Sequence, residues 1–337
     1  MNLKDGKYQG IALVKEMLET ADVIRNFDPE CAAPFADSLA QAQGLFFTGE
    51  GSSRIFPSKR AMYEAMKSGF TLPMYTEGAT QAQEYDLSRY AVLAASNSGK
   101  TKEVVRLFKS LNAKAHPHCY GVMAHAGAPL AGLSKKAHTL ACGAENAVAA
   151  TKSVAEQALF YQAVLAKLRK SSMGPLAAAA GAVKDALELG IRPEYVEAAA
   201  NAPVIYFAGR NNGVAEELTL KTNEITRKKS AFLEGTYAVH GIEEVMNQDE
   251  VVVLIDPFLE EEEKFSQVLK TGVNMTVIAI SPRETSFPTI RIPSVKGCDE
   301  YVQLAAGWNL LAEVGIALGI DLDKPVRARK VGNEFVG

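Results

Sequence analysis

Short, continuous apolar runs alternate along this chain with longer segments in which apolar residues recur at helical spacing. Runs that are apolar throughout are typical of strands in a parallel sheet that helices cover on both faces. The expected strands lie at residues 44–47, 72–78, 90–95, 120–124, 203–208, 250–256 and 274–281. The expected helices lie at residues 57–67, 101–112, 150–170, 176–198, 214–229 and 308–318, after one or two leading helices within residues 8–42. This alternation predicts an α/β fold.

The order of these elements repeats in the two halves of the chain. Each half opens with a strand, a glycine-rich turn and a helix, with GEGSSR at residues 49–54 and GRNNG at residues 209–213. At 337 residues the chain is long enough for two domains, each with its own core. We predict N-terminal helices, a first domain, a helical connection, a second domain and a tail, at residues 1–40, 41–170, 171–200, 201–320 and 321–337.

The composition excludes several classes of protein. Hydrophobic residues make up 47% of the chain and charged residues 22%, the balance of a soluble globular protein. A net charge of −3 gives no electrostatic reason to expect nucleic acid or an anionic membrane as a partner. The first residues lack an apolar leader, and no run reaches the roughly 18 apolar residues of a membrane span. The cysteines form no CxxC pair, so we expect a cytoplasmic protein without disulfides or zinc; they are Cys31, Cys119, Cys142 and Cys298.

A serine-rich turn, SNSGKT at residues 96–101, joins an expected buried strand to an expected helix. Ligands of open α/β sheets bind at this carboxyl edge, and the amino end of a helix attracts anions. Three hydroxyl groups around one glycine therefore predict a neutral cradle for phosphate, at Ser96, Ser98 and Thr101. The spacing is not that of a Walker motif. The alternative is an ordinary helix cap, since serine and threonine begin many helices.

A second group of residues has the chemistry for proton transfer. Three charged residues of the expected helix 214–229 recur at i, i+4 and i+7 and share one face: Glu217, Lys221 and Glu224. His240 follows Glu224 by sixteen residues, in a stretch rich in turn formers. A histidine suits the opening of a sugar ring, and a carboxylate of tuned pKa suits proton transfer between C1 and C2, without a metal. The alternatives are a solvated, salt-bridged helix face and a structural histidine.

In their order and separation, the stretches GEGSS, SNSGKTKE and ENAVAATKS resemble the tandem sugar-isomerase (SIS) domain family, which includes the isomerase half of glucosamine-6-phosphate synthase. The resemblance implies two SIS domains, each a flavodoxin-like three-layer sandwich with a parallel sheet between helices. It implies that the phosphate of the sugar is bound by Ser96, Asn97, Ser98 and Thr101. It also implies sugar contacts from Gly51, Ser52, Ser53 and the backbone around Val148 to Ala150, where Ala150 replaces a serine common in the family.

The second half carries AEELTLKTNEIT and a later His-Gly pair, which resemble the catalytic segment of the same family. The resemblance implies Glu224 as the C1/C2 base, His240 as the ring-opening acid and base, and Lys221 among the substrate-binding residues. In relatives the neighbouring subunit supplies the histidine, which implies a homodimer with a shared active site. This chain departs from its relatives at Thr236 and Tyr237, where Gly-Glu is common.

The tail DKPVRARKVGNEF resembles the family's C-terminal lid, in which a lysine five residues after a proline binds the open-chain sugar or forms a Schiff base with it. Pro325 and Lys330 reproduce this spacing, and the alternative is a solvated basic tail. After the expected strand 250–256, the acidic stretch PFLEEEEK should repel phosphate. We therefore expect one sugar site in each subunit.

The expected activity is that of an aldose–ketose isomerase or deaminase for an (amino)sugar 6-phosphate, acting without a cofactor. A fructosamine 6-phosphate deglycase and a non-catalytic sugar-phosphate sensor are the alternatives, because a fold alone does not determine a function. No nucleophilic cysteine lies near Met1, so we do not expect the chain to hydrolyse glutamine.

Overall fold

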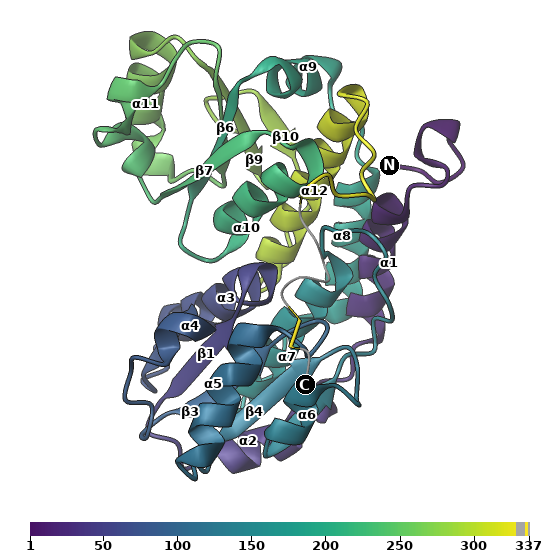
Figure 1. The fold of residues 1–337 in the computed structure, drawn as a ribbon. Helices are drawn as coiled ribbons and strands as arrows, with labels where there is room; N and C mark the ends of the chain where they lie inside the picture. Colours follow the sequence, from purple (N-terminus) through teal and green to yellow (C-terminus); the bar gives the residue numbers. More distant parts are fainter. Residues whose placement is uncertain (328–333, 336–337) are drawn as a thin grey trace. The chain divides into compact units, whose positions relative to one another are not determined.

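A computed structural model describes residues 1–327 and 334–335 of the protein (Figure 1). Contacts within the chain divide it into two compact units, each with one five-stranded parallel sheet. The first-sheet unit comprises Val23–Glu145 and Ala150–Gly174, together with the described residues from Val326 onward. The second-sheet unit comprises Met1–Asp22, Asn146–Ala149 and Pro175–Pro325. The chain therefore passes from one unit to the other more than once.

The first sheet has the strand order β2-β1-β3-β4-β5, with all neighbours parallel. This is the doubly wound order of flavodoxin-like folds, whose ligands bind where the order reverses, between β1 and β3. The strands are β1 (Leu45–Gly49), β2 (Met74–Gly78), β3 (Ala91–Ala95), β4 (Cys119–Met123) and β5 (Lys136–Thr139). The helices are α2 (Ala33–Leu39), α3 (Ile55–Lys67), α4 (Ala79–Ala82), α5 (Lys102–Ala113), α6 (Pro129–Leu133) and α7 (Lys152–Leu168).

The central strands of the first sheet are buried on both faces, because successive side chains point to opposite sides. Leu45 and Phe47 of β1 belong to a core that includes Phe160 of α7. Phe46 belongs to a separate core that includes Phe108 of α5. Every residue of β1, β3 and β4 is buried. This explains why these strands are apolar throughout rather than at alternate positions.

The second sheet has the order β10-β9-β8-β6-β7, again with all neighbours parallel. Read from β7, this order is the same as that of the first sheet. The strands are β6 (Val204–Gly209), β7 (Lys229–Glu234), β8 (Val251–Ile255), β9 (Thr276–Ser281) and β10 (Thr289–Arg291). The helices are α1 (Ala12–Asn26) up to Asp22, α8 (Leu176–Glu188), α9 (Pro193–Asn201), α10 (Val214–Lys221), α11 (Glu262–Phe265) and α12 (Asp299–Ala317). Helix α12 packs against α8, α9 and α10 and is buried along most of its length.

Each expected strand is present within a few residues of its expected bounds, and β5, β7 and β10 are additional. All three additional strands lie at sheet edges and are partly exposed, so they lack a continuous apolar run. The expected helix 214–229 is wrong at its end. The chain leaves helical geometry at Arg227, whose φ of 57° is left-handed, and Lys229 begins β7. The expected helix 176–198 is two helices, because Pro193 begins a new one.

Candidate active site

The serine-rich turn lies where the first sheet can bind a ligand, at the carboxyl end of the central strand β3. Backbone hydrogen bonds from Ser96 N to Val122 O (3.0 Å) and from Ala124 N to Asn97 O (2.9 Å) hold the turn against the end of β4. Gly99 has a φ of 64°, and a Cβ at this position would lie 2.5 Å from the Cβ of Ala128. Only glycine therefore fits there, and the turn has one defined shape.

The hydroxyl groups of the turn accept hydrogen bonds from within it. Ser96 Oγ accepts from Gly99 N at 3.1 Å and lies 2.8 Å from Thr101 Oγ1, while Ser98 Oγ accepts from Lys100 N at 3.1 Å. Each hydroxyl has one proton, and the Ser96–Thr101 pair uses only one of its two. One proton of that pair and the proton of Ser98 remain to be donated to an anion. Thr101 is the N-cap of α5 but makes no capping bond with its side chain, so the predicted cap alternative does not describe this hydroxyl.

The GEGSSR turn follows β1, the neighbour of β3 in the sheet. Gly51, Ser52 and Ser53 form a single 3-10 turn, in which Ser52 is buried. A Cβ at Gly49 would lie 2.8 Å from Ala95 O, so the ends of the two strands are in close contact. Ser53 Oγ accepts a hydrogen bond from Nε2 of Gln157 on α7, at 3.3 Å. This hydrogen bond does not use the proton of the Ser53 hydroxyl, which is left for donation to a ligand.

The stretch 145–150 contributes to both units. Val148 groups with the second-sheet unit, in which Glu16 of α1 accepts hydrogen bonds from the backbone of Asn146 and Ala147. Ala150 groups with the first-sheet unit and precedes α7. Both residues are partly buried.

Glu217, Lys221 and Glu224 lie together in the second-sheet unit, as their spacing predicts. Lys221 Nζ is 3.3 Å from Glu217 Oε1 and 2.7 Å from Glu224 Oε2. The side chains of Glu217 and Lys221 are fully buried, whereas that of Glu224 is 25% exposed. The predicted alternative of a solvated helix face is therefore wrong. Glu224 belongs to a π-helical segment, Thr222–Thr226, and such widened turns are frequent at functional sites.

The buried lysine keeps its positive charge. Burial acts to lower the pKa of Lys221, but the charges and hydrogen bonds of Glu224 and Glu217 outweigh burial and raise it above its ordinary value. An ammonium group that cannot move thus holds one carboxylate at the surface. This arrangement fixes the Glu224 carboxylate in position, which a general base requires.

His240 is exposed, and its Nε2 lies 3.1 Å from Nζ of Lys264 on α11. Glu224 precedes strand β7 and lies in a segment that contacts α12, whereas His240 follows β7, next to a turn that contacts α11. The six residues of β7 span about 17 Å. Glu224 and His240 of one chain therefore lie at opposite ends of this strand and are not brought together.

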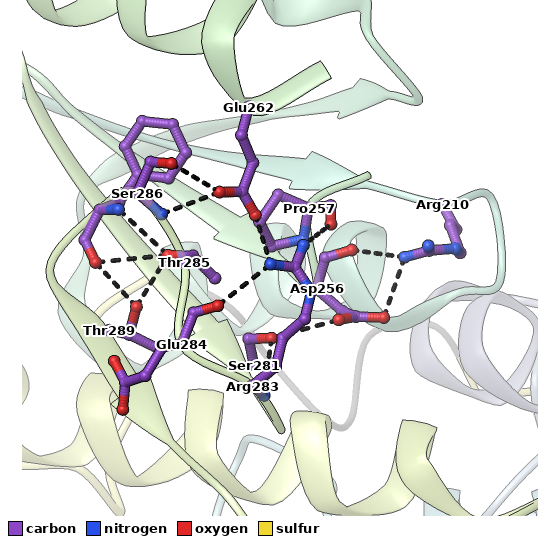
Figure 2. A network of polar contacts seen from close by, with 11 residues as sticks. Arg210, Asp256, Pro257, Glu262, Ser281, Arg283, Glu284, Thr285, Ser286 and Thr289 are labelled. Atoms are coloured by element: carbon purple, nitrogen blue, oxygen red, sulfur yellow. Dashed lines mark hydrogen bonds and ion pairs between the residues drawn. The ribbon is translucent and has the colours of Figure 1, made fainter. Parts of the chain in front are cut away.

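The carboxyl edge of the second sheet is occupied by the protein's own charges (Figure 2). Arg210 Nη1 donates to Asp256 O at 2.5 Å and lies 3.2 Å from Asp256 Oδ2, while Ser281 Oγ donates to Asp256 Oδ1 at 3.2 Å. The Arg210 guanidinium also lies 4.3 Å from the ring centroid of Phe258. Asp256 thus neutralises the arginine that could otherwise attract an anion at this edge.

The acidic stretch after β8 is also paired. Glu262 lies 2.5 Å from Arg283 Nη1 and accepts hydrogen bonds from the backbone N and the Oγ of Ser286, each at 2.8 Å. Burial acts to raise the pKa of Glu262, but these hydrogen bonds and the charge of Arg283 hold it below its ordinary value. The carboxylate therefore stays charged, consistent with an edge that does not receive phosphate.

Part of the tail lies on the serine-rich turn, although Lys330 is outside the described residues. Glu334 forms an antiparallel bridge with Thr101, and Phe335 N donates to Lys100 O at 2.7 Å. Nζ of Lys109 lies 3.8 Å from the ring centroid of Phe335. The resemblance to a C-terminal lid predicts a tail near the site, but no local pattern predicts these particular pairs, which join residues more than 200 positions apart.

Two kinds of feature are not found within residues 1–327 and 334–335. No three or more histidine, cysteine, aspartate or glutamate side chains are grouped so that they could hold a metal ion. No helix of this part of the chain has both the length and the apolar content that crossing a membrane requires.

Neither a protein-family model nor a curated protein sequence matches the chain. Solved structures do match nearly its whole length. The C-terminal domain of glucosamine-fructose-6-phosphate aminotransferase from Francisella tularensis has a TM-score of 0.79 at 17% identity, over 95% of this chain and 100% of that one. Tagatose-6-phosphate ketose/aldose isomerase from Escherichia coli has a TM-score of 0.77 at 18% identity, over 96% and 99%.

Glucosamine-6-phosphate deaminase from Thermotoga maritima has a TM-score of 0.71 at 18% identity, over 94% of this chain and 98% of that one. Identities this low establish the arrangement of the backbone rather than a shared activity. The two doubly wound sheets and these matches agree with the resemblance of the sequence motifs, and the chain has the fold of the SIS-domain phosphosugar isomerases.

Proposed function

We propose that this protein is a phosphosugar aldose–ketose isomerase or deaminase, built from two tandem SIS domains, that acts on an (amino)sugar 6-phosphate. The structures that share its fold include an aminotransferase domain, a ketose/aldose isomerase and a deaminase, all named for sugar phosphates. Reactions of this kind open the sugar ring and then move a proton between C1 and C2. The residues of the candidate site supply groups for phosphate binding and for proton transfer.

The observation that carries the proposal is the position of Glu224. A partly exposed carboxylate lies 2.7 Å from a fully buried ammonium group, which is balanced in turn by the buried Glu217. Exposed ion pairs contribute little to stability, so a surface salt bridge at Glu224 would not require the two buried charges of Lys221 and Glu217 behind it. In our proposal Glu224 removes the proton from one of the two carbons and returns it to the other. Lys221 holds the carboxylate in place, and because its side chain is fully buried it acts on the substrate through Glu224.

The phosphate of the substrate would lie on the serine-rich turn. The remaining protons of Ser98 and of the Ser96–Thr101 pair are donors, and the N-terminus of α5 adds its partial positive charge. Ser53 offers another donor beside the turn, with Gly51 and Ser52 next to it. In our proposal these neutral donors bind the anion, and hydrogen bonds to a charged acceptor are stronger than neutral ones.

Ring opening is assigned to His240, supplied by a second copy of the chain. The histidine would donate a proton to the ring oxygen and accept one from the anomeric hydroxyl. One chain holds Glu224 and His240 at opposite ends of β7, so a single chain cannot present both to one sugar. A homodimer with shared sites resolves this separation. Two large apolar side chains within five residues of His240 are exposed in one chain and suit an interface: Tyr237 and Val245.

Lys330 is proposed to bind the open-chain sugar or to form a Schiff base with its carbonyl. It precedes Glu334, which pairs with Thr101 of the serine-rich turn, by four residues. The support for this proposal is the contact of Glu334 with the turn, together with the spacing of Lys330 from Pro325 in the sequence.

The test is proton exchange in deuterated water, followed by NMR. The purified protein is incubated separately with glucosamine 6-phosphate, fructose 6-phosphate and a fructose-amino-acid 6-phosphate. Deuterium at C1 or C2 is expected, with ammonia released if the protein is a deaminase. Release of the amino acid would instead indicate the deglycase. Saturable binding without exchange for any of these sugars would contradict the enzyme and favour the sugar-phosphate sensor.

A further inference from the structure

The carboxylate of Glu145 joins two segments of the first-sheet unit that are far apart in sequence. Its Oε2 accepts a hydrogen bond from Nδ2 of Asn97, in the serine-rich turn, at 2.8 Å. The same oxygen accepts from Oγ of Ser153, in the first turn of α7, and Asn97 Nδ2 also donates to Ser153 Oγ at 3.1 Å. One carboxylate therefore connects the predicted phosphate site to the beginning of α7.

The other oxygen of Glu145 replaces a missing helix cap. Thr151 is the N-cap of α7 but makes no capping bond with its own side chain. Oε1 of Glu145 accepts instead from Thr151 N at 2.8 Å and from Ser153 N at 3.3 Å. These are N–H groups at the start of α7, where helices lack internal acceptors, and a negative charge there is favoured by the helix dipole. The start of α7 thus holds the Glu145 carboxylate in place independently of its hydrogen bond to Asn97.

The same contacts give Asn97 a second role. The resemblance implies that Asn97 binds phosphate, but its amide nitrogen donates to Glu145 and to Ser153. Ser153 Oγ and Glu145 Oε2 are hydrogen-bonded to each other, so both acceptors lie on one side of the amide nitrogen, and its second N–H is directed away from them and stays available to an anion. The side chain of Asn97 anchors the turn to α7, and the turn presents its hydroxyl groups from that anchored position.

We infer that Glu145 is a positioning residue for phosphate binding, which acts through Asn97 and touches no substrate itself. This inference rests on the proposed function in taking residues 96–101 as the phosphate site. A cradle of neutral hydroxyl donors depends on their geometry, because a hydroxyl on a short side chain cannot follow a displaced phosphate. Loss of the Glu145 charge should therefore weaken the binding of phosphorylated ligands more than it slows the chemical step.

The test compares Glu145→Gln with a matched control, Glu156→Gln. Glu156 lies on α7 itself, is 3% exposed, and accepts hydrogen bonds from Ala141 N and Cys142 N at 2.7 Å each. Both of these partners lie outside the serine-rich turn. Calorimetry with inorganic phosphate and with glucosamine 6-phosphate measures affinity, and thermal unfolding measures the structural cost. We expect about tenfold weaker binding for E145Q, which corresponds to the loss of one charge-assisted hydrogen bond. We expect near-normal binding for E156Q.

Turnover separates positioning from a general loss of structure. In E145Q the KM for the phosphorylated sugar should rise about tenfold while kcat stays within about twofold, since only binding is affected. A second variant, Asn97→Ala, tests the same link from the turn and leaves the cap of α7 intact. If Glu145 acts through Asn97, the effects of E145Q and N97A on affinity are not additive, and the double variant resembles the single ones.

Each outcome has a distinct meaning. Equal affinity of E145Q and the unaltered protein, or fully additive effects of E145Q and N97A, overturns the role assigned to Glu145 and leaves the proposed function intact. Equal losses of affinity in E145Q and E156Q would show a merely structural effect and also overturn it. If the unaltered protein binds neither inorganic phosphate nor any phosphorylated sugar, the proposed function fails and this inference fails with it.

Discussion

The carboxyl edges of the two sheets have the same backbone arrangement but opposite chemistry. In the first sheet Ser96 follows the central strand β3, and its N–H donates to Val122 O on β4. In the second sheet Asp256 follows the central strand β8, and its N–H donates to Ile280 O on β9. These positions correspond in two sheets of identical strand order. One edge carries hydroxyl groups with free protons, whereas the other carries a carboxylate already bound to Arg210.

The difference shows how a repeated fold can divide its tasks. The first-sheet unit keeps an edge that is open to an anion. The second-sheet unit pairs the charges of its own edge with one another. It carries the buried Glu217 and Lys221 on α10 and the partly exposed Glu224 in the segment after it. Under the proposed function, the first unit binds the substrate and the second supplies the base. Each half of the comparison can be altered separately.

The largest effect is expected from Glu224→Gln, which tests the catalytic half of the comparison. Glutamine keeps the shape of the side chain but cannot accept the proton, so kcat should fall by a factor of about 10² to 10⁴. Binding of glucosamine 6-phosphate, measured by calorimetry, should change little, because the phosphate donors lie in the other unit. Glu197→Gln on the exposed surface of α9 is the control. Normal turnover in E224Q would remove Glu224 from the mechanism.

The next largest effect concerns the binding half. Replacing Ser98 by Ala and Thr101 by Val removes two hydroxyl donors, each of which forms a charge-assisted hydrogen bond in the proposed complex. Affinity for a phosphorylated sugar should fall about 100-fold, whereas affinity for the unphosphorylated sugar should not change. Ser110→Ala, farther along α5, is the control. If both sugars lose affinity equally, the turn is only a structural element of the sheet edge.

The sequence predicted the parts of this comparison that depend on local pattern. Strands β1, β3 and β8 are buried on both faces and therefore apolar throughout, which made them recognisable. The edge strands β5, β7 and β10 are partly exposed, and their mixed composition does not distinguish them from loops. The serine-rich turn was also predictable, since its strand, glycine and helix are contiguous.

Contacts between distant residues were not predictable in this way. Helical spacing placed Glu217, Lys221 and Glu224 on one face, but burial of that face depends on α12, which contacts α10 and follows it by almost 80 residues. Asn97 and Glu145 are 48 positions apart, and Ser53 and Gln157 are 104 apart. No local rule pairs such residues, so the positioning of the phosphate site became visible only in the folded chain.

A third prediction tests whether the two halves of one site come from different chains. Glu224→Gln and His240→Ala should each be inactive alone. If dimers exchange at random, half of the dimers in an equal mixture contain one chain of each kind, and each keeps one intact site. About a quarter of the wild-type activity should then return after unfolding and refolding together. A mixture that remains inactive although mass spectrometry shows mixed dimers would contradict the shared site.

The smallest effect is expected from Asp256→Asn, which would make the second edge more like the first. Asparagine tolerates the left-handed backbone of Asp256, whose φ is 44°, but it cannot neutralise Arg210. In a background with Ser98→Ala and Thr101→Val, this variant should bind inorganic phosphate weakly. The expected Kd is about 1 mM, which corresponds to a binding free energy of about −4 kcal/mol. Chemical-shift changes near Arg210 would report the binding, and further replacement of Arg210 by Ala should abolish it. If D256N gains no affinity, the bond to the Asp256 backbone oxygen and the stacking on Phe258 suffice to hold Arg210, and the second edge is closed by shape as well as by charge.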